Sequence, residues 1–408
     1  MPKLKARVYI LAYRNMFQME EQQFLTLDFG TTALKVGVFK AKRVKGSALP
    51  HLTIYTKTFG YEIGDTSMVL PQSKKDISSY APVLVSFLAT YQRSILHLID
   101  NGYQLSNFNS ITVFSCAPSV VLVDKDRAPL CDLFLSSHFV PSRRGVVGYY
   151  EAHAEALLNS FLLESSSYRE SLINDDNIFV AFSDYIGYLL TGNLFFSCAN
   201  KLLQPYFSTN TVGYPFPPFC ELGHRIGSTK ETKSPLFKDT KIVLYSGGAD
   251  YIADMLGAAF FSQAEGLLRC GSQEGLNLYT SDYEFAKQAK GVGFSLMPHP
   301  FAKGYVISKI IKPFLAKDES YLKEVSLQLL SLFKIRKDVK TILLCGGQAD
   351  VESANKIRKE LLDAKITVSG WGSYCGVAGA CALLLYKNGF FSSLMEASLF
   401  ISTYLQKG

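Results

Sequence analysis

The sequence predicts an α/β protein built from two similar units. Residues 24–40 contain two β-prone runs on either side of the turn Asp28–Thr32, which together indicate a β-hairpin. Residues 266–280 repeat this pattern around the Gly- and Ser-containing turn Gly271–Gly275. Strand-like and helix-like segments alternate after each hairpin, as they do in sheets covered by helices. We therefore expect a pseudo-duplicated chain with a cleft between its halves.

The first half continues with a strand and a long helix. His51–Lys57 is β-prone, and Ile77–Asp100 carries apolar residues at helical spacing until Asn101-Gly102 ends the helix. The later elements of this half are strands at Ile111–Cys116 and Val120–Asp124, helices at Val147–Leu163 and Ile178–Leu190, a long loop at Pro205–Pro218 and a buried strand at Lys241–Tyr245.

The second half has the same kinds of element. Helix Tyr251–Phe261 is predicted before the second hairpin. The elements predicted after that hairpin are strand Thr341–Cys345, helix Ala349–Ala364, strand Ile366–Ser369 and helix Val377–Lys387. We place the domain boundary near residue 248, which gives a first domain at 20–248 and a second at 249–408. Residues 1–19 are expected to be a disordered extension, because their apolar stretch is too short for a signal peptide.

Composition excludes several classes of protein. The 408 residues are 48% hydrophobic and 19% charged, which fits a folded globular protein and not a disordered one. The net charge is +7, and Lys3, Lys5, Arg7 and Arg14 account for 4 of it, so the remainder carries 7 − 4 = +3. That balance predicts no nucleic-acid partner, and no apolar run is long enough for a membrane span. The eight scattered cysteines indicate a reduced, cytoplasmic protein.

The turn Asp28–Thr32 has the chemistry that a nucleotide polyphosphate requires. Gly30 permits close approach of the backbone, Thr31 and Thr32 supply hydroxyl donors, and a carboxylate at Asp28 can hold Mg²⁺. Lys35 lies on the following strand, where it can neutralise charge or simply face solvent. An ordinary hairpin turn has a similar composition, so the turn by itself leaves both interpretations open.

A second motif, Ser246–Asp250, places an aspartate after a buried strand and two glycines. Ligand sites of α/β proteins lie at such strand ends, and Asp250 can accept a proton there from a substrate hydroxyl. The alternative is an N-cap aspartate. Because a helix N-terminus lowers the pKa of a carboxyl group, we expect Asp250 to be a weak base. Asp254, one turn further along the predicted helix, is the fallback candidate.

A third motif, Gly346–Ala349, connects a strand to a helix through two glycines. Such a connection lets a flat base or a ribose lie against the backbone, although a tight strand–helix turn needs the same residues. The glycine-rich stretch Gly370–Gly376 has the wrong spacing for a dinucleotide-binding loop.

Together and in this order, the motifs resemble those of the FGGY carbohydrate kinases, and most closely its xylulokinase-like members. The family's opening pattern D-x-G-T-T-x-x-K/R matches Asp28 to Lys35, and its G-G-G-D motif matches Gly247–Asp250. The other matched segments, which extend the resemblance over residues 24–387, are Ile111–Leu130, Asp184–Gly192, Ser197–Ala199, Gly257, Gly271-Ser272 and Gly346–Ala349.

The resemblance implies two actin-like (ribonuclease H-like) α/β domains around a nucleotide and sugar cleft, with ATP and Mg²⁺ as cofactors. It implies that Asp250 is the catalytic residue and Asp28 the Mg²⁺ ligand. The nucleotide-binding residues that it implies are Gly30, Thr31, Thr32, Lys35, Gly271 and Ser272 for the phosphates and Gly346, Gly347, Gln348 and Ala349 for adenosine. The substrate-binding residues that it implies are Asp250, Tyr251 and Ser119.

The chain departs from the family pattern in the segments that bind the sugar in the family. Ser115–Ser119 stands where members carry a Gln-Met-His or Gln-Arg segment, and Leu135–Phe139 replaces the usual W-x-D-x-R. Between Gly291 and Leu344 the F-x-P-x-x-x-G-E-R segment is missing. The phosphate-handling motifs are therefore retained while the sugar-reading motifs are altered.

We accordingly expect ATP-dependent phosphorylation of a hydroxyl on a small sugar or polyol. A non-catalytic ATP- or sugar-binding relative, kept for regulation, is the alternative that the altered motifs favour. An actin-like ATPase without a sugar substrate is the third. The expected partner is a small molecule, with neither nucleic acid nor membrane, and a homodimer is one option for the assembly.

Overall fold

The structure is a computed structural model. It describes residues 21–69, 81–117, 119–135, 177–197, 217–261, 265–271, 274–291, 295–311, 339–361 and 364–405. The predicted extension at 1–19, the predicted helix at 147–163 and most of the predicted loop at 205–218 lie outside these ranges.

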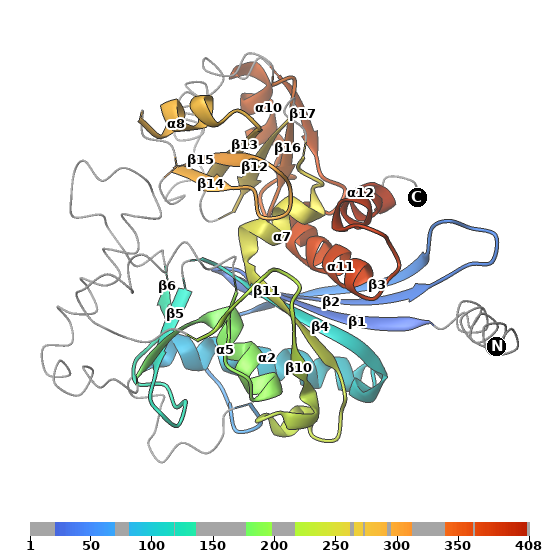
Figure 1. The fold of residues 1–408 in the computed structure, drawn as a ribbon, viewed down its shortest axis with the longest axis vertical. Helices are drawn as coiled ribbons and strands as arrows, with labels where there is room; N and C mark the ends of the chain where they lie inside the picture. Colours follow the sequence, from blue (N-terminus) through green and yellow to red (C-terminus); the bar gives the residue numbers. More distant parts are fainter. Residues whose placement is uncertain are drawn as a thin grey trace, which may run out of the picture.

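Six strands form the first sheet, in the order β10-β11-β4-β1-β2-β3 (Figure 1). Strands β1, β2 and β3 form an antiparallel meander, which confirms the predicted hairpin and the strand after it. Strand β4 is parallel to β1, and β11 is parallel to β4. The bounds are β1 Gln22–Phe29, β2 Ala33–Lys42, β3 His51–Gly60, β4 Phe108–Ser115, β10 Arg225–Ser228 and β11 Val243–Ala249.

The second sheet repeats this plan, with the order β14-β15-β13-β12-β16-β17. Its meander is β12, β13 and β15, and β16 and β17 follow as parallel strands beyond β12. The two predicted units are therefore present as two mixed sheets that share a five-strand order, with β10 and β14 as additional antiparallel edge strands. The bounds are β12 Glu265–Cys270, β13 Glu274–Thr280, β14 Ser295–Pro298, β15 Tyr305–Ile311, β16 Thr341–Cys345 and β17 Lys365–Val368.

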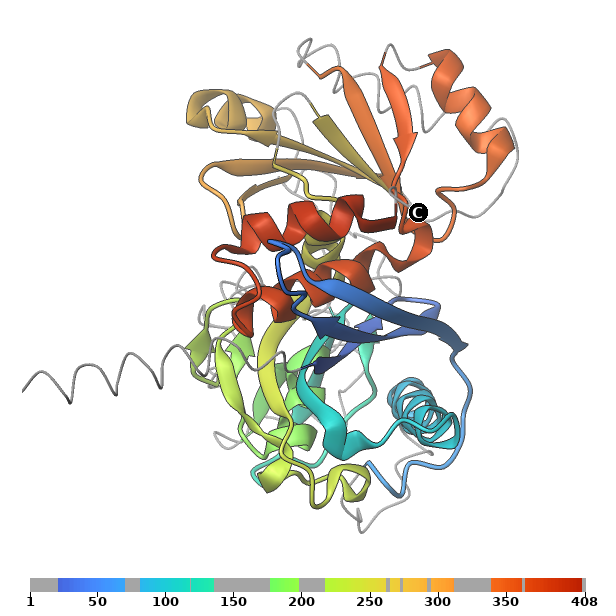
Figure 2. The ribbon, with the colours of Figure 1, turned by 90° about the vertical axis from the view of Figure 1, so that its right-hand side faces the viewer.

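Helices cover both faces of the first sheet. Helices α2 (Pro82–Asp100) and α5 (Phe182–Thr191) lie on one face, while α7 (Asp250–Gly257), α11 (Cys375–Lys387) and α12 (Leu394–Tyr404) lie between the two sheets (Figures 1 and 2). The remaining elements are helices α8 Tyr283–Gly291 and α10 Glu352–Leu361, strands β5 Ser119–Val123, β6 Phe134–Leu135, β7 Ile178–Ala181, β8 Phe196–Ser197 and β9 Phe219–Cys220, and short 3₁₀ turns at Leu105–Asn107, Thr229–Glu231, Pro235–Phe237 and Gly372–Tyr374.

The alternation of side chains along β1 decides where Asp28 points. Leu25, Leu27 and Phe29 belong to the core under α2 and α5. Phe24 belongs to the core formed with α7, α11 and α12. Because successive side chains of a strand point to opposite faces, Asp28 shares the face of Phe24. The strand period therefore places this carboxylate on the side of the interposed helices.

Four predicted elements are corrected by the structure. Residues 178–181 form strand β7, paired antiparallel with β5, and the helix begins only at Phe182, because the β-prone run Ile178–Ala181 finds a partner strand. Strand β11 continues through the two glycines to Ala249, with an irregular register between Tyr245 and Gly248. Helices α7 and α10 are shorter than predicted, and α7 ends before Ala259, which has a left-handed φ of 52°.

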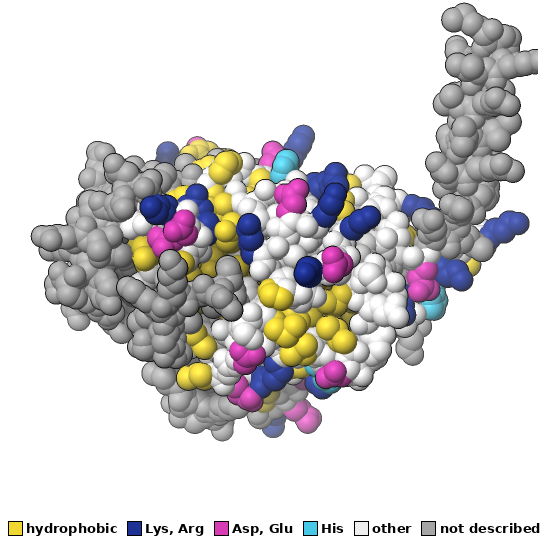
Figure 3. Space-filling model, turned by 90° about the horizontal axis from the view of Figure 1, so that it is seen from below, with side chains coloured by type: hydrophobic (Ala, Val, Ile, Leu, Met, Phe, Trp, Pro, Cys, Tyr) yellow, Lys and Arg dark blue, Asp and Glu magenta, His cyan; other side chains and the backbone are white. Residues whose placement is uncertain are grey.

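The domain boundary near residue 248 stays a prediction, because α7 and α11 follow it in sequence yet pack on the first sheet. None of the described helices is long and apolar enough to cross a membrane. On the face drawn in Figure 3, the described cationic and acidic side chains are interspersed among apolar ones, so this face presents no broad area of a single sign.

Candidate active site

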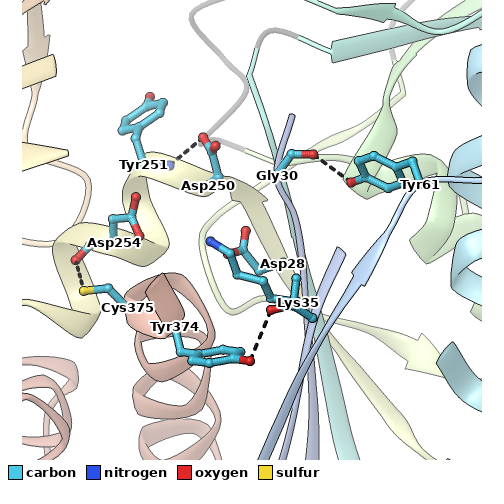
Figure 4. A network of polar contacts seen from close by, with 10 residues as sticks. Asp28, Gly30, Lys35, Tyr61, Asp250, Tyr251, Asp254, Tyr374 and Cys375 are labelled. Atoms are coloured by element: carbon cyan, nitrogen blue, oxygen red, sulfur yellow. Dashed lines mark hydrogen bonds and ion pairs between the residues drawn. The ribbon is translucent and has the colours of Figure 1, made fainter. Parts of the chain in front are cut away.

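Four charged side chains meet between the first sheet and helix α7 (Figure 4). Asp28 comes from the end of β1 and Lys35 from the directly opposite position of β2, which places Lys35 Nζ 3.8 Å from Asp28 Oδ2. Asp250 is the first residue of α7, and Asp254 lies one turn further along it. The sequence reasoning named all four residues, and the fold brings them together.

Asp28 lies in an environment that opposes its ionisation. Burial raises its pKa to about 7, although the charge of Lys35 acts in the other direction; the charges of Asp254 and Asp250 raise it further. Its Oδ1 is buried and accepts no hydrogen bond from the described residues. For Lys35, burial lowers the pKa, but the surrounding carboxylates outweigh that effect and leave the pKa raised. The site therefore holds more negative charge than Lys35 balances.

The first turn of α11 packs directly against Asp28 and Asp254. A Cβ added at Gly376 would lie 2.5 Å from Asp28 Oδ2 and 3.4 Å from Asp254 Oδ1. Only glycine permits this approach, which places the positive end of the helix dipole against the two carboxylates. The sequence motifs do not single out Gly376, because the spacing of Gly370–Gly376 does not fit a dinucleotide-binding loop. The density of glycines before a helix was the available signal.

Asp28→Asn is expected to stabilise the fold at alkaline pH. In the unfolded chain Asp28 ionises near pH 4, whereas in the fold it keeps its proton to about pH 7, so stability falls as pH rises through this range. The full shift corresponds to about 4 kcal/mol. In EDTA and without nucleotide, urea unfolding should show the variant about 2–4 kcal/mol more stable at pH 8 and little changed at pH 4.5.

Asp65→Asn is the matched control for this pH dependence. Asp65 is exposed, and hydrogen bonds from the backbone and side chain of Ser67 lower its pKa, so its removal should destabilise the fold as pH rises. If Asp28→Asn were no more stable than the parent protein at pH 8, the cost of burying an ionised Asp28 would be refuted.

Asp250 is a stronger base than the sequence indicated. Burial raises its pKa to about 6, which Arg269 opposes and Asp254 augments. The expectation that the helix N-terminus would lower this pKa is wrong, because desolvation is the larger effect. The residue is also not the N-cap: Ala249 holds that position, and Asp250 Oδ1 accepts a hydrogen bond of 2.7 Å from Tyr251 N. Asp250 is thus poised to exchange a proton near neutral pH.

Arg269 is a site residue that the sequence reasoning missed. It lies on β12, and its charge is the largest influence that lowers the pKa of both Asp250 and Asp254. Its guanidinium Cζ lies 5.6 Å from the ring centroid of Tyr251. The sequence signal that could have identified Arg269 is a basic residue at the otherwise apolar end of a predicted strand. Tyr251, predicted to bind substrate, is 2% exposed and packs in the core below Arg269.

The turn after β1 is anchored by its glycine. Gly30 N donates to Ala33 O at 3.0 Å, and Gly30 O accepts from the Tyr61 hydroxyl at 2.7 Å (Figure 4). Thr31 is half-buried and Thr32 is exposed. The equivalent turn after β12 begins at Gly271, while Ser272 lies outside the described residues. Equivalent positions in the two sheets thus carry the two predicted phosphate turns.

The third motif lies beside the second of these turns. Gln348 N donates to Cys270 O at 2.9 Å, which binds the loop after β16 to the end of β12. Gly346 has a φ of 100°, and a Cβ there would lie 2.6 Å from Cys270 O. Gly347 is exposed, Gln348 is half-buried and Ala349 is fully buried, so the first two offer surface to a ligand.

Ser119, the remaining predicted substrate residue, is buried and bonded within the protein. Its hydroxyl donates to Cys116 O at 2.5 Å and lies 3.3 Å from Ser115 Oγ. Ser115 Oγ in turn accepts from Ser183 N at 3.2 Å. These bonds tie β4, β5 and α5 together at the site's edge.

Known structures share this fold. The chain is similar to glycerol kinase from Plasmodium falciparum, solved with ADP, at a TM-score of 0.66 and 12% identity over 94% of this chain and 92% of that one. Gluconate kinase from Lactobacillus acidophilus matches at a TM-score of 0.61 and 11% identity, over 95% and 96% of the two chains. Xylulose kinase from Rhodospirillum rubrum matches at 0.61 and 14%, over 92% of each.

These likenesses confirm the predicted fold: two actin-like α/β units arranged as in the FGGY carbohydrate kinases, over nearly the whole chain. No protein-family model matches the sequence. No curated protein matches it either.

Proposed function

We propose that this chain is a kinase that transfers the γ-phosphoryl group of ATP to a hydroxyl of a small sugar or polyol. The observation that carries the proposal is the convergence of Asp28, Lys35, Asp250 and Asp254 at one place in a fold shared with sugar and polyol kinases. Phosphoryl transfer relies on positioned charge more than on covalent chemistry, and this arrangement supplies that charge.

Nucleotide binding is supported by the two equivalent turns and the loop beside them. The turns at Gly30–Thr32 and at Gly271-Ser272 would hold phosphates from the two sheets, with Lys35 as a neutralising cation. Gly346–Ala349 would hold the adenosine, where Gly347 leaves room for a flat ring. Since the similar glycerol kinase was solved with ADP, ATP is the nucleotide that we expect here.

The residues present fit Mg²⁺. Among the described residues Asp28 has a buried carboxylate oxygen without a hydrogen-bond donor, and the three carboxylates outnumber the two cations Lys35 and Arg269. A hard cation that prefers oxygen ligands would satisfy both conditions. Asp28 would hold the ion, directly or through water, with Asp254 near enough to orient that water. When bound, Mg²⁺ neutralises phosphate charge.

Asp250 would act as the general base. It would take the proton from the substrate hydroxyl while that oxygen bonds to the γ-phosphorus and the bond from phosphorus to the bridging oxygen of ADP breaks. A pKa of about 6 leaves most of the carboxylate ionised at neutral pH. Arg269 would hold it in that state by opposing the effect of burial.

A single assay tests this proposal. Purified protein with Mg-ATP is given a panel of pentoses, hexoses and polyols, and ADP release is measured for each. At least one acceptor should raise ADP release above the acceptor-free rate by orders of magnitude, because transfer needs an oriented hydroxyl. Release that ignores the panel would indicate an ATPase without a sugar substrate.

One observation favours a second candidate, a non-catalytic nucleotide-binding relative. Ser115 and Ser119 lie in the segment that binds the sugar in the family that the sequence resembles, and here their hydroxyl groups form hydrogen bonds within the protein. Under this alternative the chain binds ATP, as measured by calorimetry, yet turns over no member of the panel. Turnover of any acceptor eliminates it.

A further inference from the structure

A second cluster of metal-binding side chains lies directly behind the candidate active site. Asp254, Cys345 and Cys375 each offer one ligand atom, and the three atoms lie within 4.8 Å of one another. They come from three elements: the middle of α7, the last residue of β16 and the first residue of α11. No role proposed above uses the two sulfurs.

The packing of α7 against α11 fixes the cluster. The Cys375 thiol donates to the backbone oxygen of Asp254 at 3.4 Å (Figure 4). A Cβ added at Gly257 would lie 2.0 Å from Cys375 O, so the two helices touch backbone to backbone at this point. Both thiols are fully buried, whereas Asp254 is half-buried. The three residues are therefore already close together, and Asp254 is the one among them that is partly exposed.

The donor set identifies the kind of ion. Two sulfurs with one carboxylate oxygen suit borderline and soft cations such as Zn²⁺ and Cd²⁺, whereas Mg²⁺ prefers oxygen alone. Tetrahedral zinc with Zn–S distances of about 2.3 Å keeps its ligands roughly 3.5–3.8 Å apart. The separations of at most 4.8 Å therefore need to close by no more than about 1 Å. Water or a phosphate oxygen would complete the fourth position.

We propose that Asp254, Cys345 and Cys375 form an inhibitory site for a thiophilic divalent cation, of which Zn²⁺ is the type, separate from the Mg²⁺ position at Asp28. Binding replaces the two thiol protons with the metal and draws Asp254 toward the sulfurs. Because Asp28 and Asp254 both lie beside Gly376, the bound ion also adds positive charge near Asp28 and competes with Mg²⁺ there. The inhibitory consequence rests on the proposed kinase function, and metal binding itself does not.

Cadmium tests the binding with a readout that needs no catalysis. The reduced full-length protein is titrated with Cd²⁺, and the cadmium–thiolate charge-transfer absorption is followed. One ion per chain should bind, and Cys345→Ser or Cys375→Ser should weaken its affinity at least about tenfold. Cys381→Ser is the matched control, because Cys381 is a fully buried thiol on the same helix α11 but outside the cluster.

Two results of the cadmium titration would overturn the proposal. An absent band, or a band that survives both cluster variants, overturns the proposal and leaves the two thiols as core packing. Cys345→Ala and Cys375→Ala repeat the test in case a serine disturbs folding. A further measurement needs no variant: the parent protein is unfolded with and without Zn²⁺, and the metal should raise the midpoint of unfolding.

The inhibitory arm uses turnover of whichever acceptor the panel identifies. Zn²⁺ should inhibit the parent enzyme and the Cys381→Ser control, with at least about tenfold less effect on Cys375→Ser. Inhibition of all three to the same degree would refute the inhibitory role. If cadmium binds as expected but no acceptor is turned over, the kinase proposal fails while the metal site stands.

Discussion

Asp250→Asn is expected to abolish phosphoryl transfer while ATP affinity stays nearly unchanged. Asparagine has the shape of aspartate and can still accept the hydrogen bond from Tyr251 N, but it cannot take a proton. Loss of a general base typically lowers turnover by about 10²–10⁴-fold. The site should otherwise stay folded, because removing a carboxylate whose pKa burial raises to about 6 relieves a desolvation cost.

The measurement is ADP release with the best acceptor, together with calorimetry of Mg-ATP binding. Asp254→Asn is the matched comparison, since it removes a carboxylate one turn away on the same helix. It should reduce turnover less than Asp250→Asn does. If Asp250→Asn kept most of its turnover, Asp250 would not be the general base. If Asp254→Asn lost more turnover than Asp250→Asn, the general base would be Asp254.

The positions of the site's carboxylates could be predicted from sequence because local rules determine them. The hairpin pattern places Lys35 on the strand next to Asp28, and the register of β1 and β2 then sets the two residues opposite each other. The end of a buried strand followed by a helix likewise fixes that Asp250 lies at the sheet's edge. These features need only the periodicity of the chain and its turn residues.

The properties of the same residues could not be predicted, because they depend on distant parts of the chain. Burial in the folded protein raises the pKa of Asp250 to about 6, whereas the sequence around Asp250 reveals only the opposing effect of its own helix. Arg269 and Gly376 join the site from β12 and α11, more than a hundred residues from Asp28. The predicted helix Ile178–Leu190 loses its first four residues to strand β7, because the distant strand β5 offers them a partner.

Gly379→Ala is expected to destabilise the fold strongly, because α7 and α11 meet with no room for a methyl group. A Cβ at Gly379 would lie 1.8 Å from Ala253 O and 2.7 Å from Gly257 N. Alanine favours a helix over glycine by about 1 kcal/mol. Overpacking a core costs about 1–3 kcal/mol even where side chains can yield, and here the obstructing atoms are backbone. The clash therefore outweighs the gain in helix propensity.

The destabilisation should be accompanied by a functional loss, because the same helix pair carries the site. Forcing α11 away from α7 would withdraw Gly376 from Asp28 and Asp254, so Mg-ATP affinity should fall even at temperatures where the variant stays folded. The measurements are the urea midpoint and calorimetry with Mg-ATP.

Gly60→Ala is the matched control for the helix contact, since it makes the same chemical change at a strand position where no atom of the described residues lies within 4 Å of the added methyl group. Its effect should stay within about 1 kcal/mol, the range of strand propensities. If Gly379→Ala were as stable as Gly60→Ala, the backbone contact between α7 and α11 would be wrong. If it were destabilised but bound Mg-ATP normally, the helix pair would support the fold without aligning the carboxylates.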